Sequence, residues 1–216
     1  MLLDEKLDRL LHDLIAQWNI AERRVKKAEF VQGGEVVSSA IFELRYAGRK
    51  LIDSHLLILQ KDWKNDPKVY EDICRFLADA IEDCVKAKHD AIDAMVDFIT
   101  IWFHELEQRV GLEKLVELFP EYLDVTAKIV QIQDKISQSR EDRIASRDGV
   151  YDEIEETDYK SLLQLYDKMR VSRDRVGAII DRKRQKDRRD FWLLLIPAVG
   201  AVILVAFELY KLFWGH

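Results

Sequence analysis

Residues that interrupt helices are scarce in this chain. Its 216 residues include only three prolines and eight glycines, whereas Leu, Ile, Ala, Lys, Arg, Glu and Asp dominate. Because proline and glycine are the residues that helix interiors tolerate least, their scarcity predicts helices along nearly the whole chain. The expected fold class is all-α, a cytoplasmic antiparallel bundle of long helices joined to one C-terminal transmembrane helix.

Cysteine is nearly absent as well. Cys74 and Cys84 are ten residues apart on one predicted helix, about 15 Å along its axis, which is too far for a disulfide. A reduced cytosolic domain is therefore expected. The chain also lacks a phosphate-binding glycine loop, a nucleophile elbow, a paired-histidine zinc motif and cysteine pairs at metal spacing. This argues against most common enzymes, and we expect no cofactor and no metal.

The one long hydrophobic run lies near the C-terminus. From Phe191 to Phe207 the sequence reads FWLLLIPAVGAVILVAF, without a charge. An α-helix needs roughly 20 apolar residues to cross a bilayer, and this run reaches that length if Glu208 and Lys211 lie near the headgroups. We therefore predict a transmembrane helix over 191–214, and a single-pass membrane protein.

A basic block stands directly before this run. It consists of Arg182, Lys183, Arg184, Lys186, Arg188 and Arg189. Because Lys and Arg near a span stay preferentially on the cytoplasmic side, residues 1–190 should face the cytoplasm and the C-terminus should lie across the membrane. The block is expected to bind anionic lipids of the bilayer. The start of the chain lacks the basic and apolar regions of a secretory signal, so the span is predicted to be both targeting signal and anchor, as in tail-anchored proteins.

The predicted span contains residues suited to contacts between helices. A proline and small residues lie close together in it: Pro197, Ala198, Gly200 and Ala201. Proline and glycine permit a kink, and small side chains permit the close approach of a second helix. Glu208 either lines a pore formed by several copies or pairs with Lys211 and reaches the headgroups. We therefore expect a homo-oligomer.

Apolar stripes at helical spacing organise the rest of the chain. We expect helices over 2–30, over 36–60, from Pro67 nearly to Gly111, and over 112–146. Asp66 is the expected N-cap of the third helix. Pro120 marks either the true start of the fourth helix or a bend after a short helix. Together these helices form a predicted bundle over 1–146. We interpret their apolar stripes as core, including the stripe of the second helix with Ile41, Ile52 and Leu59.

Two further segments connect the bundle to the predicted span. The charged stretch 147–158 predicts a solvated acidic loop. Residues 159–190 predict a charged connecting helix that ends in the basic block. On the long helix, His89 and Asp93 are four residues apart and share a face, as metal ligands would. One such pair supplies too few ligands, so a solvated or hydrogen-bonded helix face is the preferred interpretation.

Two residues of the helix over 36–60 are candidates for catalysis. In the stretch FELRYAGRKLIDSH, five residues separate Arg49 from His55. An imidazole can move the proton of a ribose 2′-hydroxyl while a guanidinium stabilises the charged phosphorane, so the pair suits metal-independent RNA cleavage. Positions six apart on a helix point about 120° away from each other, so the two side chains would converge only through a groove or a dimer partner. Alternatively, Arg49 forms a surface ion pair with Asp53 and His55 caps the edge of the core.

This stretch resembles the motif of the HEPN superfamily of helical-bundle proteins, whose nucleases carry an arginine, four to six residues and then a histidine. The resemblance covers the stretch and the helical layout of about 1–146, and it implies Arg49 and His55 as active-site positions. Two features differ from the family pattern: Lys50 stands where members commonly have a polar residue such as Asn, and the motif lies on the second helix rather than late in the bundle. HEPN-like bundles joined to a membrane helix occur among bacterial antiviral defence effectors, including accessory proteins of RNA-targeting CRISPR systems. That similarity implies a membrane pore, with a protein or an RNA-containing complex as activator.

Three functions therefore stay open at the level of the sequence. The leading hypothesis is a non-enzymatic, oligomeric membrane protein that acts as a scaffold or a pore. The second is a membrane-tethered RNase that uses Arg49 and His55. The third is a tail-anchored adaptor that localises a soluble partner.

Overall fold

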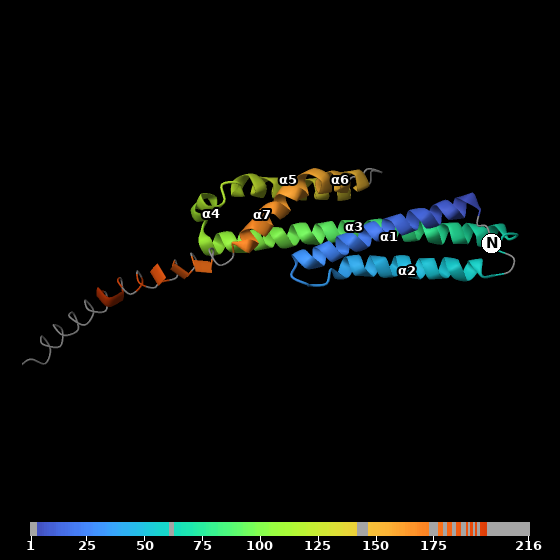
Figure 1. The fold of residues 1–216 in the computed structure, drawn as a ribbon, viewed down its shortest axis with the longest axis horizontal. Coiled ribbons are helices and arrows are strands. Elements are labelled where there is room, and N and C mark those ends of the chain that lie inside the picture. The colour runs from blue at the N-terminus through green and yellow to red at the C-terminus, as the bar shows by residue number, and fades with distance from the viewer. Residues whose placement is uncertain are drawn as a thin grey trace, which may run out of the picture. The chain divides into compact units, whose positions relative to one another are not determined.

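The computed structural model describes residues 4–60, 63–141 and 147–172, together with scattered positions between 177 and 197. Its elements in chain order are α1 (Glu5–Val31), α2 (Ser38–Ile58), α3 (Pro67–Val110), α4 (Leu112–Leu118), α5 (Tyr122–Glu141), α6 (Arg147–Glu153), the π-helix η1 (Ile154–Asp158) and α7 (Tyr159–Val171) (Figure 1). Within these ranges there is no strand, and the predicted all-α fold class is confirmed.

The chain divides into two compact units. The first contains Met1–Phe103 and Asp124–Leu162, and the second contains His104–Leu123 and Leu163–His216. Helices α1, α2 and α6 therefore lie wholly in the first unit, together with most of α3 and α5. Helix α4 and most of α7 belong to the second.

Local sequence signals set the helix ends of the first unit. The side chain of Asp4 accepts a hydrogen bond from the backbone N–H of Leu7 at 2.9 Å and so caps α1. The turn after α1 contains Gly33 and Gly34, both with positive φ, a conformation that glycine adopts without steric cost. Asp66 accepts hydrogen bonds from two backbone N–H groups at 3.0 and 3.3 Å, so the predicted N-cap of α3 is confirmed.

Helix α3 supplies much of the core of the first unit. Its fully buried apolar residues recur at helical spacing: Ile73, Leu77, Ala80, Cys84, Ala87, Ala91, Met95, Val96 and Ile99. Two side chains connect neighbouring elements to it. Gln32, just after α1, donates to the carbonyl oxygen of Ala94 at 2.9 Å. Lys50 of α2 forms an ion pair with the buried carboxylate of Asp83 at 2.7 Å. The apolar stripe of α3 therefore packs as core.

The second unit also contains buried apolar residues. Leu115, Phe119 and Tyr122 are among them. The hydroxyl of Tyr122 donates to Glu107 at 3.1 Å. The bend around Pro120 separates α4 from α5, so a bend after a short helix is the correct alternative of the two that the sequence left open.

The stretch 147–158, predicted as a solvated acidic loop, is helical instead. It forms α6 and η1, in which Tyr151 and Ile154 are fully buried. Tyr159 and Leu162, which follow the π-helix, are also buried, so the segment has one apolar face. Acidic side chains alternate with these buried residues along 147–158, so the composition of the stretch alone does not indicate an apolar face.

The predicted transmembrane helix over 191–214 lies almost wholly outside the described residues. Of its positions, only 191, 193 and 195–197 are described, and these are helical. In the described part of the chain, no helix combines the length and the apolar character that crossing a membrane requires. The candidate contact residues Ala198, Gly200, Ala201 and Glu208 lie outside that part, as do Lys183, Arg184 and Arg188 of the basic block.

Candidate functional site

The structure places the two candidate catalytic residues on the surface of α2. Both Arg49 and His55 have exposed side chains. Arg49 forms an ion pair with Asp53, with Nη2 3.0 Å from Oδ1 and Nε donating to Oδ2 at 3.2 Å. This is the surface ion pair that the sequence offered as the alternative. In the described residues no hydrogen bond or ion pair joins Arg49 to His55.

A group of buried polar side chains lies on α3, where it faces α5 and α6. Lys88, His89 and Asp93 are each less than one-tenth exposed. Burying such groups is costly unless each one finds a partner. All three do, so the hydrogen-bonded alternative for this helix face is the correct one. We call these three residues and their partners Arg140, Asp148, Tyr151 and Asp152 the α3–α6 polar cluster.

His89 lies at the centre of the α3–α6 polar cluster. Its Nε2 is 2.8 Å from an Oδ of Asp148, and its ring stacks on that of Tyr151, with centroids 4.0 Å apart. Burial lowers the pKa of His89 below its ordinary value, although the negative charge of Asp148 by itself would raise it. Burial by itself would raise the pKa of Asp148, but Lys88 and His89 hold it below its ordinary value. We therefore assign a neutral imidazole whose Nε2–H donates to an ionised Asp148.

Lys88 adds a second connection between α3 and α6. Its ammonium group lies 3.2 Å from Asp148 and 3.2 Å from Asp152. The Lys88 side chain is only 8% exposed, whereas both carboxylates are more than half exposed. The buried charge is thus compensated by two acids at the edge of the cluster.

Asp93 accepts hydrogen bonds from two other elements. The hydroxyl of Tyr151 donates to it at 2.8 Å, and Arg140 of α5 donates at 2.5 Å. The neighbouring Asp90 and Asp97 have raised pKa values, chiefly because they are partly buried and secondly because of the charge of Asp93. Asp93 therefore joins α3, α5 and α6 through one carboxylate.

The chemistry of the α3–α6 polar cluster favours a structural role. A nucleophile would need to lie within hydrogen-bond reach of His89, but the neighbouring hydroxyl of Tyr151 donates to Asp93, and burial raises the pKa of that phenol. Among the described residues no group of three or more His, Cys, Asp or Glu side chains is placed to hold a metal ion. His89 and Asp93, considered as a ligand pair from the sequence, have separate partners instead.

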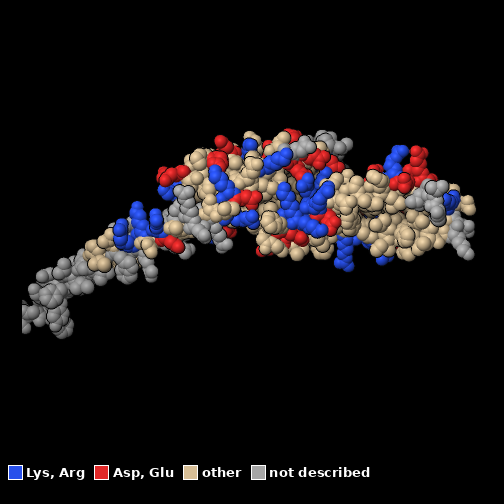
Figure 2. Space-filling model, in the orientation of Figure 1, with Lys and Arg blue, Asp and Glu red and all other residues tan. Residues whose placement is uncertain are grey.

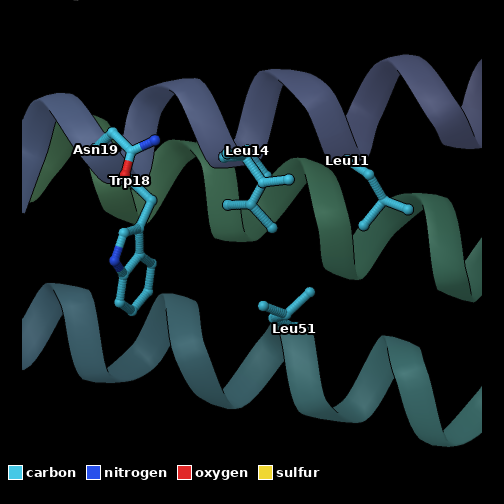
Figure 3. A pocket seen from close by; sticks show the side chains of 6 residues that line it. Leu11, Leu14, Trp18, Asn19 and Leu51 are labelled. Atoms are coloured by element: carbon cyan, nitrogen blue, oxygen red, sulfur yellow. The ribbon is translucent and has the colours of Figure 1, made fainter.

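An apolar groove of about 300 Å³ lies between α1 and α2. Its lining residues are Leu11, Leu14, Ile15, Trp18, Asn19 and Leu51. Figure 3 shows Leu11 and Leu14 of α1 and Leu51 of α2 on facing walls, with the indole of Trp18 extending toward α2. The groove adjoins α2, where several apolar residues that the sequence assigned to the core are exposed, including Ile41, Ile52 and Leu59.

No family model, curated protein or solved structure matches this chain. The resemblance of the Arg49 to His55 stretch to HEPN nucleases therefore rests on the residues of that stretch and on the helical layout.

Proposed function

We propose that this chain is a membrane-anchored, oligomeric helical protein that acts as a scaffold or effector rather than as an enzyme. The observation that carries the proposal is the uncharged run from Phe191 to Phe207 directly after six basic residues. Hydrophobic length fits a transmembrane helix, and the basic residues fit the cytoplasmic side of a bilayer. In this proposal residues 1–190 form the cytoplasmic part and 191–214 the anchor.

The described positions around this junction support the proposal. Phe191, Leu193 and Ile196 are helical, and each exposes more than half of its surface. Removing one such side chain from water is favourable by about 1.5–3 kcal/mol, so a bilayer would stabilise this segment. Arg182 and Lys186 are also exposed on helical backbone, which leaves them accessible to anionic headgroups.

The contacts of the first unit support a non-enzymatic role. In the α3–α6 polar cluster the hydrogen-bonding groups of Lys88, His89 and Asp93 pair with residues of α6 and so connect the two helices. The exposed apolar side chains of α1 and α2 are instead suited to binding another protein. A scaffold or effector needs such a surface.

An exchange of the anchor separates the versions of this proposal. Residues 191–216 are replaced by an unrelated single-pass anchor in one variant, and Glu208→Gln is introduced in another. If the span lines a pore, the full-length protein should release dye from liposomes, and both variants should release less. If the span only anchors a scaffold or adaptor, liposomes stay sealed and the exchanged protein keeps its membrane localisation and function. A full-length protein that does not associate with membranes would contradict both versions.

A membrane-tethered RNase is the second candidate, because Arg49 and His55 are both exposed to solvent on α2. It predicts cleavage of single-stranded RNA without metal by the oligomeric full-length protein, and loss of cleavage in His55→Ala. His12→Ala, which changes an exposed histidine of α1, is the matched control. Equal activity in the wild type and both variants would remove this candidate.

A further inference from the structure

A polar pocket lies between α1 and the π-helix η1. It has a volume of about 260 Å³ and is lined by Arg24 of α1, Asp152 of α6, Glu155 of η1 and Lys160 of α7. All four residues belong to the first unit. The volume is close to the lower end of the range in which small-molecule sites fall, so the pocket has room for a small ligand.

The guanidinium of Arg24 is only partly satisfied in this pocket. Its Nη2 forms an ion pair with the carboxylate of Glu155, and the Arg24 side chain is 28% exposed. Its Nε is buried and has no hydrogen-bond partner among the described residues. Burial lowers the pKa of Arg24, because it removes the positive charge from water. A buried donor without a partner is costly, so Glu155 alone does not compensate for the burial of this side chain.

The charges around the pocket favour a negatively charged ligand. The carboxylate of Asp152 already pairs with Lys88 at 3.2 Å, and that of Glu155 pairs with the guanidinium. Lys160 and Arg23, by contrast, are exposed and form no ion pair with a described residue. Figure 2 shows Lys and Arg side chains gathered over the second half of α1. This region therefore attracts anions, although the chain as a whole has a formal net charge of −6.

The backbone on one side of the pocket is unusual. Glu155 belongs to η1, and π-helices are rare and are frequently found at functional sites. The neighbouring acids Glu153 and Asp158 pair with Lys135 of α5 at 3.0 and 2.8 Å. Glu155 pairs with α1 instead, so its carboxylate occupies the position on Arg24 that the anionic group of a ligand would take.

The lining residues favour phosphate over carboxylate. A guanidinium binds either group through two parallel hydrogen bonds. A carboxylate ligand would only replace one carboxylate on Arg24 with another. A phosphate monoester carries about −1.5 to −2 charges at neutral pH and three acceptor oxygens, so it can contact both cations of the pocket. We infer that the pocket between α1 and η1 binds a small ligand with a phosphate group through Arg24 and Lys160, in competition with Glu155.

The first test titrates the full-length protein in detergent with inorganic phosphate at constant ionic strength, followed by isothermal titration calorimetry. Glu155→Gln should bind phosphate at least about threefold more tightly than the wild type, because it removes the competing charge from Arg24. Lys160→Ala should bind about tenfold more weakly, because it loses a charge-assisted hydrogen bond. Lys26→Ala removes an exposed lysine about 200° around α1 from Arg24, so this matched control should bind as the wild type does.

Three results would overturn the inference. The first is that Glu155→Gln shows no binding of phosphate. The second is that Lys160→Ala and Lys26→Ala weaken binding equally, which would show a diffuse attraction of anions to basic residues, including the basic block. The third is that acetate binds as tightly as phosphate, which would exclude the phosphate class.

The second test identifies the source of the phosphate group. Glycerol 3-phosphate represents a soluble ester, and a short-chain phosphatidic acid represents a lipid headgroup. Binding of glycerol 3-phosphate that Lys160→Ala weakens would indicate a soluble ligand, and such binding of the lipid alone would indicate a headgroup. Either result supports the site, and binding of neither would overturn it. The inference does not depend on the membrane anchor: a protein that binds phosphate in this way but fails to associate with membranes would contradict the anchor and leave the site standing.

Discussion

The hydrogen bond between Tyr151 and Asp93 should be one of the larger single contributions to the stability of the first unit. Tyr151 is fully buried, and its hydroxyl donates to the Asp93 carboxylate at 2.8 Å. The change Tyr151→Phe removes only this hydroxyl. Asp93 then keeps Arg140, so its charge stays paired.

The expected cost follows from these contacts. A hydrogen bond to a charged group contributes about 1.5–3 kcal/mol, so Tyr151→Phe should lower the free energy of unfolding by about 2 kcal/mol. Asp93→Ala removes the same bond and leaves the buried hydroxyl of Tyr151 without its acceptor. This variant also loses the ion pair between Asp93 and the largely exposed Arg140, which is worth at most about 1 kcal/mol. We expect about 3 kcal/mol for this variant. Since both changes remove one shared bond, the double variant should lose about 1–2 kcal/mol less than the sum.

Urea unfolding of the full-length protein in detergent, followed by the helical circular dichroism signal, measures these differences. Tyr46→Phe, which changes a tyrosine exposed on α2, is the matched control and should have almost no effect. If Tyr151→Phe is as harmless as Tyr46→Phe, or if the two changes at the cluster are additive, the bond does not hold α6 on α3 and the reasoning fails.

Three further predictions concern single residues. Burial lowers the pKa of His89, so the unfolded chain binds a proton at this residue more readily than the folded protein does. The stability that neutral His89 contributes is therefore present above about pH 6.5 and is lost on acidification. Between about pH 7.5 and 5.5 the urea midpoint of the wild type should fall relative to that of His89→Gln. A constant difference would show that His89 does not titrate in this way. Burial raises the pKa of Cys84 to about 11, so a thiol reagent at neutral pH should label this residue only after unfolding, and rapid labelling of the native protein would contradict the burial. Gly111 has φ of 93°, so Gly111→Ala should cost about 1–2 kcal/mol in the urea assay, whereas Gly149→Ala inside α6 should be neutral or stabilising; equal effects would refute the conformational argument.

Elements with long, regular stripes and clear end signals could be predicted from the sequence. The sequence predicts the first three helices over 2–30, over 36–60 and from Pro67 nearly to Gly111, and each observed helix begins and ends within a few residues of those limits. The helices α6 and η1 could not be predicted, because their acidic composition is typical of a loop. What makes them helical is the burial of Tyr151 in α6 and of Ile154 in η1, in a core supplied by distant parts of the chain.

For the candidate sites as well, contacts between residues close in sequence could be predicted, and contacts between distant residues could not. The pairing of Arg49 with Asp53 follows from their spacing on one helix, and the structure shows it. The pairing of His89 with Asp148 joins residues 59 positions apart, and no local pattern indicates it. Periodicity identifies an apolar stripe but does not show whether another part of the chain covers it. For this reason the sequence assigned Leu59 to the core, although the structure shows it exposed.

We propose that the segment after the basic block anchors the chain in a membrane. The decisive experiment is alkaline carbonate extraction of membranes from cells that produce the full-length protein. We expect the full-length protein to stay in the membrane pellet and a variant ending at position 190 to move to the supernatant. Release of the full-length protein into the supernatant would show that no transmembrane anchor is present.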